Sequence, residues 1–206
     1  MSKTSTRGTT PPQLTLRERN KLRTRQELLD AALEVFAESG YGSATVEAIA
    51  ATAGASKVTL YAYFPHGRDE LFRVIYDEIN NQLLEQATQV YGSMTGLYVD
   101  RILALTKALM DVAQNPLIGR FYSIEDPALD VALDPVRGHA SRVWTELIAR
   151  DLEEARVAGT INTKGNPNAL AVLLVGAMRS ALSDVSQARV PSQDILDAFE
   201  ALISTL

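Results

Sequence analysis

The segment "SATVEAIAATAGASKVTLYAYFPHG", residues 43–67, holds two short helical patterns on either side of a glycine-containing turn. Thr45 is a suitable N-cap for a helix that ends near residue 52. Residues 53–55 form the turn, and Ser56 can cap a second helix that ends near Phe64. Two short helices in this arrangement predict a helix-turn-helix.

The second helix, "SKVTLYAYF" at 56–64, has one apolar face and one mixed face. At about 100° per residue, Leu60 and Phe64 point together and can pack on the preceding helix. Opposite them lie Val58, Thr59 and Ala62, and the rims of this outer face carry Ser56, Lys57, Tyr61 and Tyr63. Short central side chains let a backbone approach base edges in a major groove, and rim donors can reach phosphates. The alternative, that the two tyrosines are ordinary half-buried aromatics, stays open.

The rest of the chain repeats helical spacing, and no stretch alternates with the period of a strand, so we expect an all-α fold. The first helical pattern covers 17–39 and stops at Gly40. The later patterns cover 68–91, 97–114, 117–125, 136–158, 167–186 and 193–204. We divide the chain into a disordered basic arm at 1–16, a helix-turn-helix domain at 17–67 and a larger helical domain at 68–206.

Charge is distributed unevenly along the 206 residues, although the net charge is −5. Residues 1–73 hold ten Lys or Arg against eight Asp or Glu, and residues 74–206 hold ten against seventeen. Only Glu18 opposes the basic side chains of the first 25 residues, which are Lys3, Arg7, Arg17, Arg19, Lys21, Arg23 and Arg25. Such asymmetry favours an anionic partner for the basic end, although a solvated tail explains it as well.

Other classes of protein are disfavoured by composition. The chain has no cysteine, which excludes disulfides and thiolate metal sites and fits a reducing cytoplasm. No run of about 18 uninterrupted apolar residues is present, so we expect no membrane association. Apolar residues make up 46% of the chain, enough for a packed core.

The segment "TVEAIAATAGASKVTLYAYFPHGRDELF", with "AALEVFAESGYGSAT" before it, resembles the DNA-binding signature of the TetR (tetracycline-repressor) family of bacterial transcriptional regulators. The resemblance covers residues 20–75. It implies that Ser56, Lys57, Thr59, Tyr61 and Tyr63 contact operator DNA, and that Thr45 contacts a phosphate. This chain departs from the family pattern in two places: Val58 stands where many members have glycine, and the link before Leu71 is one residue longer. Family members usually have a phosphate-binding lysine in that link, and Arg68 is our candidate for the residue that replaces it here.

The resemblance also implies that the larger domain dimerises and encloses a small-molecule effector. Candidate pocket residues, which mix apolar walls with polar groups, are Tyr98, Leu105, Leu109, Phe121, Tyr122, His139, Trp144 and Met178. The segment 169–182 is apolar around most of its circumference and predicts neighbours on two sides. With the last helix it supplies our candidate dimer interface: Leu174, Val175, Met178, Leu182, Ile195, Phe199 and Leu202.

Two other functions fit the sequence less well. An enzyme needs a catalytic or metal-binding constellation, but the chain has two histidines and no zinc, di-iron or phosphate-loop motif, so we expect no cofactor and no metal. A helical adaptor for other proteins would explain the apolar helices of 169–204 but not the helix-turn-helix or the basic arm. The sequence therefore favours a ligand-responsive, homodimeric, cytoplasmic regulator of transcription, a repressor that a small molecule releases from a palindromic operator.

Overall fold

The computed structural model describes residues 14–93, 96–124, 126, 129 and 138–206. Over these residues the chain is helical with no strand, which confirms the all-α prediction. The helices are α1 Leu16–Ser43, α2 Val46–Thr52, α3 Lys57–Tyr63, α4 Gly67–Ser93, α5 Tyr98–Gln114, α6 Pro116–Tyr122, α8 His139–Val157, α9 Pro167–Ser186 and α10 Ser192–Ile203. Apart from 14–16, the predicted arm at 1–16 lies outside the described residues.

The ends of α1 follow from local hydrogen bonds. Thr15 and Glu18 form a capping box, so the helix begins one residue before the predicted start. Gly40 has φ 74° and interrupts the regular helix as predicted, because a positive φ suits glycine best. Helical structure resumes for one turn up to Ser43, which the prediction missed.

The bounds of the later helices differ from prediction by one to three residues, except those of α9, which agree with it. The pattern predicted over 117–125 is the shorter helix α6, which ends at Tyr122, and the pattern over 136–158 is α8, which begins at His139. Pro116 and Pro167 each occupy the first turn of a helix, behind an asparagine N-cap. Proline suits this position because its missing N–H would have no partner within the helix.

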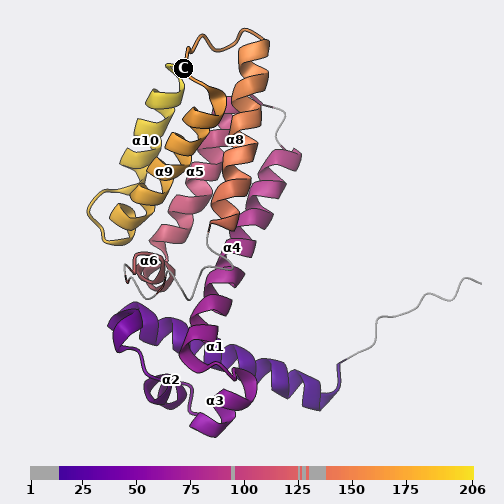
Figure 1. Ribbon diagram of the computed structural model, residues 1–206, viewed down its shortest axis with the longest axis vertical. Helices are drawn as coiled ribbons and strands as arrows, with labels where there is room; N and C mark the ends of the chain where they lie inside the picture. The colour runs from indigo at the N-terminus through magenta and orange to yellow at the C-terminus, as the bar shows by residue number, and fades with distance from the viewer. Residues whose placement is uncertain (1–13, 94–95, 125, 127–128, 130–137) are drawn as a thin grey trace, which may run out of the picture.

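The helices form two groups that α4 connects (Figure 1). Helices α1, α2 and α3 lie at one end, and α4 runs from this end alongside the bundle of α5, α8, α9 and α10. The short helix α6 contacts both α1 and α9, so it lies where the two groups meet. A change in the bundle therefore has two routes to the N-terminal helices, through α4 and through α6.

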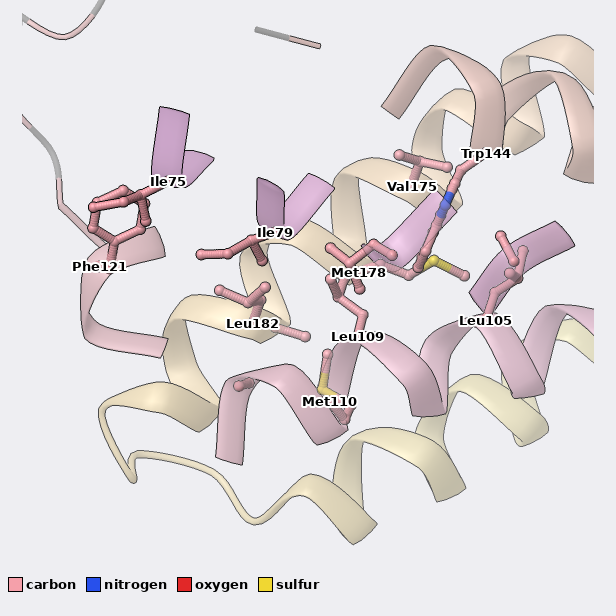
Figure 2. Packing of buried hydrophobic residues seen from close by; sticks show 14 of the residues in the cluster. Ile75, Ile79, Leu105, Leu109, Met110, Phe121, Trp144, Val175, Met178 and Leu182 are labelled. Carbon is pink, nitrogen blue, oxygen red and sulfur yellow. The ribbon is translucent and has the colours of Figure 1, made fainter. Parts of the chain in front are cut away.

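One apolar core joins the two groups. It extends from Leu28 of α1 to Ile203 of α10, both with no exposed surface. Within the bundle, side chains of α4, α5, α8 and α9 meet, as Figure 2 shows for Ile79, Leu109, Met110, Trp144, Val175, Met178 and Leu182. Burial of such side chains is the main favourable term in folding.

A buried ion pair fastens α5 to α8. The guanidinium of Arg101 donates two hydrogen bonds to the carboxylate of Asp151, at 2.9 and 2.8 Å, and the Asp151 side chain is only 2% exposed. The Arg101 guanidinium also lies 5.8 Å from the centre of the Tyr91 ring. Burying charges is costly unless they are paired and hydrogen-bonded, and this bidentate geometry meets that requirement.

Helix α9 is the most apolar of the long helices. Among the described helices it alone has the length and composition of a membrane span, a test that core helices of globular proteins also pass. It packs on α5, α6 and α8 and buries Ala171, Leu174, Val175, Met178, Ala181 and Leu182. The expectation of no membrane association stays a prediction.

Candidate nucleic-acid interface and cavity

The helix-turn-helix predicted from the sequence is present in α2 and α3. The hydroxyl of Thr45 accepts a hydrogen bond from the Ala48 N–H at 3.1 Å, and that of Ser56 accepts one from the Thr59 N–H at 3.0 Å. Between the helices Gly54 adopts φ 62°, which reverses the chain without strain. Both predicted N-caps are therefore confirmed.

The inner face of α3 anchors it to the N-terminal core. Leu60 and Phe64 are fully or almost fully buried, as are Ile49 and Ala50 of α2. The Arg25 guanidinium of α1 lies 5.4 Å from the centre of the Phe64 ring. The helical-wheel assignment of this face is confirmed, and it determines which residues of α3 face outward.

The outer face of α3 is open to solvent at its centre. Val58 is 80% exposed and Ala62 is exposed, while Thr59 is half-buried and its hydroxyl lies 2.9 Å from that of Ser56. On the rims Tyr61 is 48% exposed and Tyr63 is half-buried. Val58 therefore takes no part in the core, and its methyl groups lie at the protein surface among the polar groups of the rims.

Lys57 forms an ion pair with Glu47 of α2. Its Nζ lies 2.9 Å from the glutamate carboxylate, and both side chains are more than half exposed. The hydrogen bond with Lys57 lowers the pKa of Glu47, and the same bond raises the pKa of Lys57. Lys57 is therefore charged and at the protein surface, with its ammonium held at the α2 side of the helix.

Arg68, our candidate phosphate contact, is bound to the end of α1. Its guanidinium donates hydrogen bonds to the carbonyl oxygens of Tyr41 and Ala44 at 3.3 Å, and lies 4.5 Å from the centre of the Tyr41 ring. The Tyr41 hydroxyl donates to Asp69, and burial raises the pKa of Tyr41 to about 12. Arg68 thus holds the start of α4 against α1, and a phosphate contact by this residue stays a prediction.

Exposed basic side chains extend along the first turns of α1. They are Arg17, Arg19, Lys21 and Arg23. Only Arg23 in this group forms an ion pair within the described residues, with Glu27 on the next turn. The N-terminal part of α1 therefore presents positive charge to solvent.

A cavity of about 850 Å³ lies between α4, α5, α6, α8 and α9. Five of the eight predicted pocket residues line it: Leu109, Phe121, Tyr122, Trp144 and Met178. The other three do not. Leu105 is fully buried in the core, Tyr98 donates a hydrogen bond to the Ile203 carbonyl of α10 at 3.2 Å, and His139 is exposed at the start of α8.

Helix α4 also contributes to this cavity, although none of its residues was predicted to line it. Phe72, Tyr76, Asn80 and Leu83 line it, at a spacing that places them on one face of the helix. The Tyr122 hydroxyl donates to the Asn80 Oδ1 at 2.6 Å, and its ring stacks on that of Tyr76 with centres 5.2 Å apart. A polar asparagine within an apolar stripe was the available signal. Among the described residues, no group of three or more acidic or histidine side chains could hold a metal ion.

An aromatic cluster connects the cavity to α1. Phe121 lines the cavity, and its ring centre lies 4.4 Å from that of Phe72. Phe72 in turn lies 4.9 Å from Phe36 and 5.1 Å from Tyr41, both in α1. Packed rings transmit displacement because the interior is too dense to absorb it.

The residues predicted for the dimer interface lie mainly in the chain's own core. Leu174, Val175, Met178, Leu182 and Phe199 are at most 6% exposed, Ile195 is half-buried, and only Leu202 is open, at 51%. The physical reason is that α5 and α8 cover this side of α9. The exposed side of α9 instead carries Val172, Leu173, Gly176, Ala177 and Ser180, with Val172 and Leu173 at 59% and 69%.

Comparison with known proteins places these features in a family context. Residues 28–75 match the family model of the bacterial regulatory proteins of the tetR family. A TetR-like transcriptional regulator from Rhodococcus sp. RHA1 superposes with a TM-score of 0.70 at 24% identity, covering 92% of this chain and 96% of that one. The regulator FadR from Bacillus subtilis, solved in complex with stearoyl-CoA, gives 0.72 at 16% identity, covering 88% and 98%.

A third similar structure is the fatty acid degradation regulator FadR from Bacillus halodurans, with a TM-score of 0.72 at 16% identity and coverage of 87% and 93%. At these identities the likeness establishes the fold over both groups of helices. The family match, in contrast, includes α2 and α3, the two helices of the helix-turn-helix.

Proposed function

We propose that the chain is a cytoplasmic, homodimeric repressor that a small molecule releases from its operator, because residues 28–75 match the family model of the tetR regulators and the chain has the fold of TetR-like transcriptional regulators. The observation that carries the proposal is the outer face of α3, where Val58 is 80% exposed between hydroxyl and ammonium groups. We assign 17–67 to DNA binding and 68–206 to effector binding and dimerisation.

In this proposal α3 enters the major groove. Val58, Ala62 and the methyl group of Thr59 face the bases, where methyl groups suit the C5-methyl of thymine. The Ser56, Lys57, Tyr61 and Tyr63 side chains lie beside the phosphates, and Thr45 at the start of α2 reaches another. The exposed basic residues of α1 add positive charge along the duplex.

The dimer in this proposal forms through the exposed faces of α9 and α10. Val172, Leu173 and Leu202 are each more than half exposed, and Gly176 and Ala177 leave room for a close approach of a second helix. A two-fold axis would bring the same faces of both protomers together and bury these side chains. Two recognition helices related by that axis require an operator with inverted repeats.

The effector in this proposal occupies the cavity and acts through α6 and α4. A molecule that moves Phe121 also moves Phe72, whose ring packs against Phe36 and Tyr41 of α1. An effector releases DNA to the extent that it binds one arrangement of the N-terminal helices better than the other. The similar regulator FadR from Bacillus subtilis was solved in complex with stearoyl-CoA, which supports the choice of a small molecule as the effector.

Duplex binding is expected to weaken as salt rises, because each neutralised phosphate releases counterions. Replacing Lys57 with glutamine should lower affinity on all sequences alike and reduce the slope of log K against log salt by about 1. Glu47→Gln should not lower affinity, because it removes a carboxylate that competes with phosphate for Lys57. Fluorescence anisotropy of labelled duplex over a salt series measures both effects.

Lys107→Gln is the matched control. Lys107 is an exposed lysine that pairs with a carboxylate, Asp111, as Lys57 does, but it lies on α5. Its loss should leave the salt slope unchanged. If Lys57→Gln altered base preference while the slope and overall affinity stayed the same, the assignment of Lys57 to phosphate would be wrong.

A further inference from the structure

The cavity contains a buried hydrogen-bond donor that has no partner among the described residues. Trp144 is 4% exposed and lines the cavity, and its Nε1–H makes no hydrogen bond with the described residues. Figure 2 shows its ring extending from α8 toward Met178, beside Val175. Buried polar groups are almost always paired, so an unpaired one at a cavity wall indicates an acceptor that a ligand supplies.

Two further groups at the cavity wall have donors to spare. Asn80 is 6% exposed, and its carbonyl oxygen is occupied by the Tyr122 hydroxyl, whereas its NH₂ group has no partner among the described residues. Arg179 lines the same cavity from the exposed side of α9, and it forms no ion pair with the described residues. Burial and Tyr76 raise the pKa of Tyr122 well above its usual range, and the charge of Arg179, which lines the same cavity, opposes that rise.

The acceptors of the cavity wall are already engaged. Asp184 pairs with Arg189, the Ser183 hydroxyl accepts from Gln187, and the Ser123 hydroxyl bonds that of Ser186. Asp126 also has an interaction within the chain. The hydroxyls of Tyr76, Ser141 and Ser180 can donate or accept. Groups that can only donate therefore dominate what the cavity offers a ligand.

From this arrangement we propose that the effector is an amphipathic organic acid. Its carboxylate binds the Arg179 guanidinium, and further oxygen atoms of the ligand accept from the Asn80 amide and the Trp144 indole. Its apolar body lies against Phe72, Leu83, Leu109 and Met178, which line the same cavity. This inference rests on the proposed function, since it names the class of molecule that occupies the proposed effector site.

Charge distinguishes this class from its analogues. A carboxylate gains a charge-assisted, bidentate interaction with arginine that an alcohol of the same length lacks, and an amine would be repelled. The body contributes through burial, so each added methylene should strengthen binding about fourfold until the cavity is filled. The expected order is therefore decanoate, octanoate, 1-octanol and octylamine, from tightest to weakest.

The test is titration of the full chain with these four probes. Trp144 is the only tryptophan of the chain, so its fluorescence reports occupancy of the cavity directly, and calorimetry supplies Kd for every variant. We expect octanoate to bind at least about tenfold more tightly than 1-octanol. Arg179→Gln should weaken both carboxylates by between about tenfold and a hundredfold while leaving 1-octanol unchanged.

Trp144→Phe, measured by calorimetry, should weaken octanoate about fivefold because it removes a neutral donor and keeps an aromatic ring. Arg120→Gln removes an exposed arginine of α6 that does not line the cavity, and it should change nothing. Equal binding of octanoate and 1-octanol, a preference for octylamine, an unchanged preference in Arg179→Gln, or no binding of either carboxylate would each overturn the inference.

Duplex binding by the same preparations separates this inference from the proposed function. If the wild-type chain binds duplex DNA but no carboxylate, the ligand class is wrong and the regulator remains. If the wild-type chain binds a carboxylate but no duplex, the proposed function fails and the chemistry assigned to the cavity stands.

Discussion

Replacing Val58 with glutamate is expected to lower duplex affinity by at least about a hundredfold. The side chain is 80% exposed at the centre of the outer face of α3, so the new carboxylate would lie among base edges and phosphates. It would lose an apolar contact and add repulsion between like charges, and effects of this size cost several kcal/mol. The fold should not suffer, because a glutamate in the first turn of a helix is favourable. Fluorescence anisotropy with an operator selected from random duplexes measures the affinity, and thermal melting measures the stability of the fold.

Val157→Glu is the control for this substitution. Val157 is a similarly exposed valine, at 74%, but it ends α8 in the other group of helices. The Val157→Glu protein should bind DNA as the wild type does. A Val58→Glu protein with undiminished affinity would show that another surface, such as the basic part of α1, makes the contact.

Leu173→Glu is expected to produce monomers at micromolar concentration. The side chain is 69% exposed on α9 beside Val172, at 59%. In a two-fold interface the substitution would introduce two carboxylates at once into an apolar contact. A monomer should also bind the operator between about a hundredfold and ten-thousandfold more weakly than a dimer. In a dimer, binding of one protomer to its half-site holds the other protomer close to the second half-site, and a monomer loses this advantage. Sedimentation velocity gives the oligomeric state, and anisotropy gives the affinity.

The same Val157→Glu protein serves as the control, since it places a carboxylate on an exposed apolar site outside the proposed interface. It should sediment as the wild type does. If Leu173→Glu remained a stable dimer, the protomers would associate through a different face, and the exposed side of α9 would need another explanation.

Local hydrogen bonding explains why the helix-turn-helix could be predicted from the sequence. The N-caps at Thr45 and Ser56 and the positive φ of Gly54 are each determined within four residues along the chain. The burial of Leu60 and Phe64 followed from helical period alone. None of these features depends on how distant helices pack.

Features that depend on distant packing could not be predicted in the same way. Helix α9 is apolar around most of its circumference, so its sequence does not indicate that Leu174 and Met178 face the core while Leu173 faces solvent. The Lys57–Glu47 pair spans ten residues and requires the angle between α2 and α3. Arg68 was assigned by position in a motif, and its bonds to the end of α1 appear only once α4 is placed.

The residues that line the cavity could be predicted only in part. Phe121, Tyr122 and Trp144 were found because aromatic residues on amphipathic helices commonly wall ligand sites. Tyr98 and Leu105 also lie on an amphipathic helix, but Tyr98 bonds to α10 and Leu105 is buried in the core. Only the packing of α5 against α9 and α10 decides this difference. Asn80 carried the clearest signal, since an asparagine inside an apolar stripe requires a partner.

Selection of binding sites from random duplexes by the wild-type chain tests whether two copies of α3 read an operator. The selected sites should be inverted repeats with thymines near the centre of each half-site, and Thr59→Ala should relax the selection at those positions. Each lost base contact should cost about 1–3 kcal/mol. Sites without an inverted repeat, or a half-site that Thr59→Ala and Val58→Gly both leave unaltered, would contradict the assignment of α3 as the reading helix.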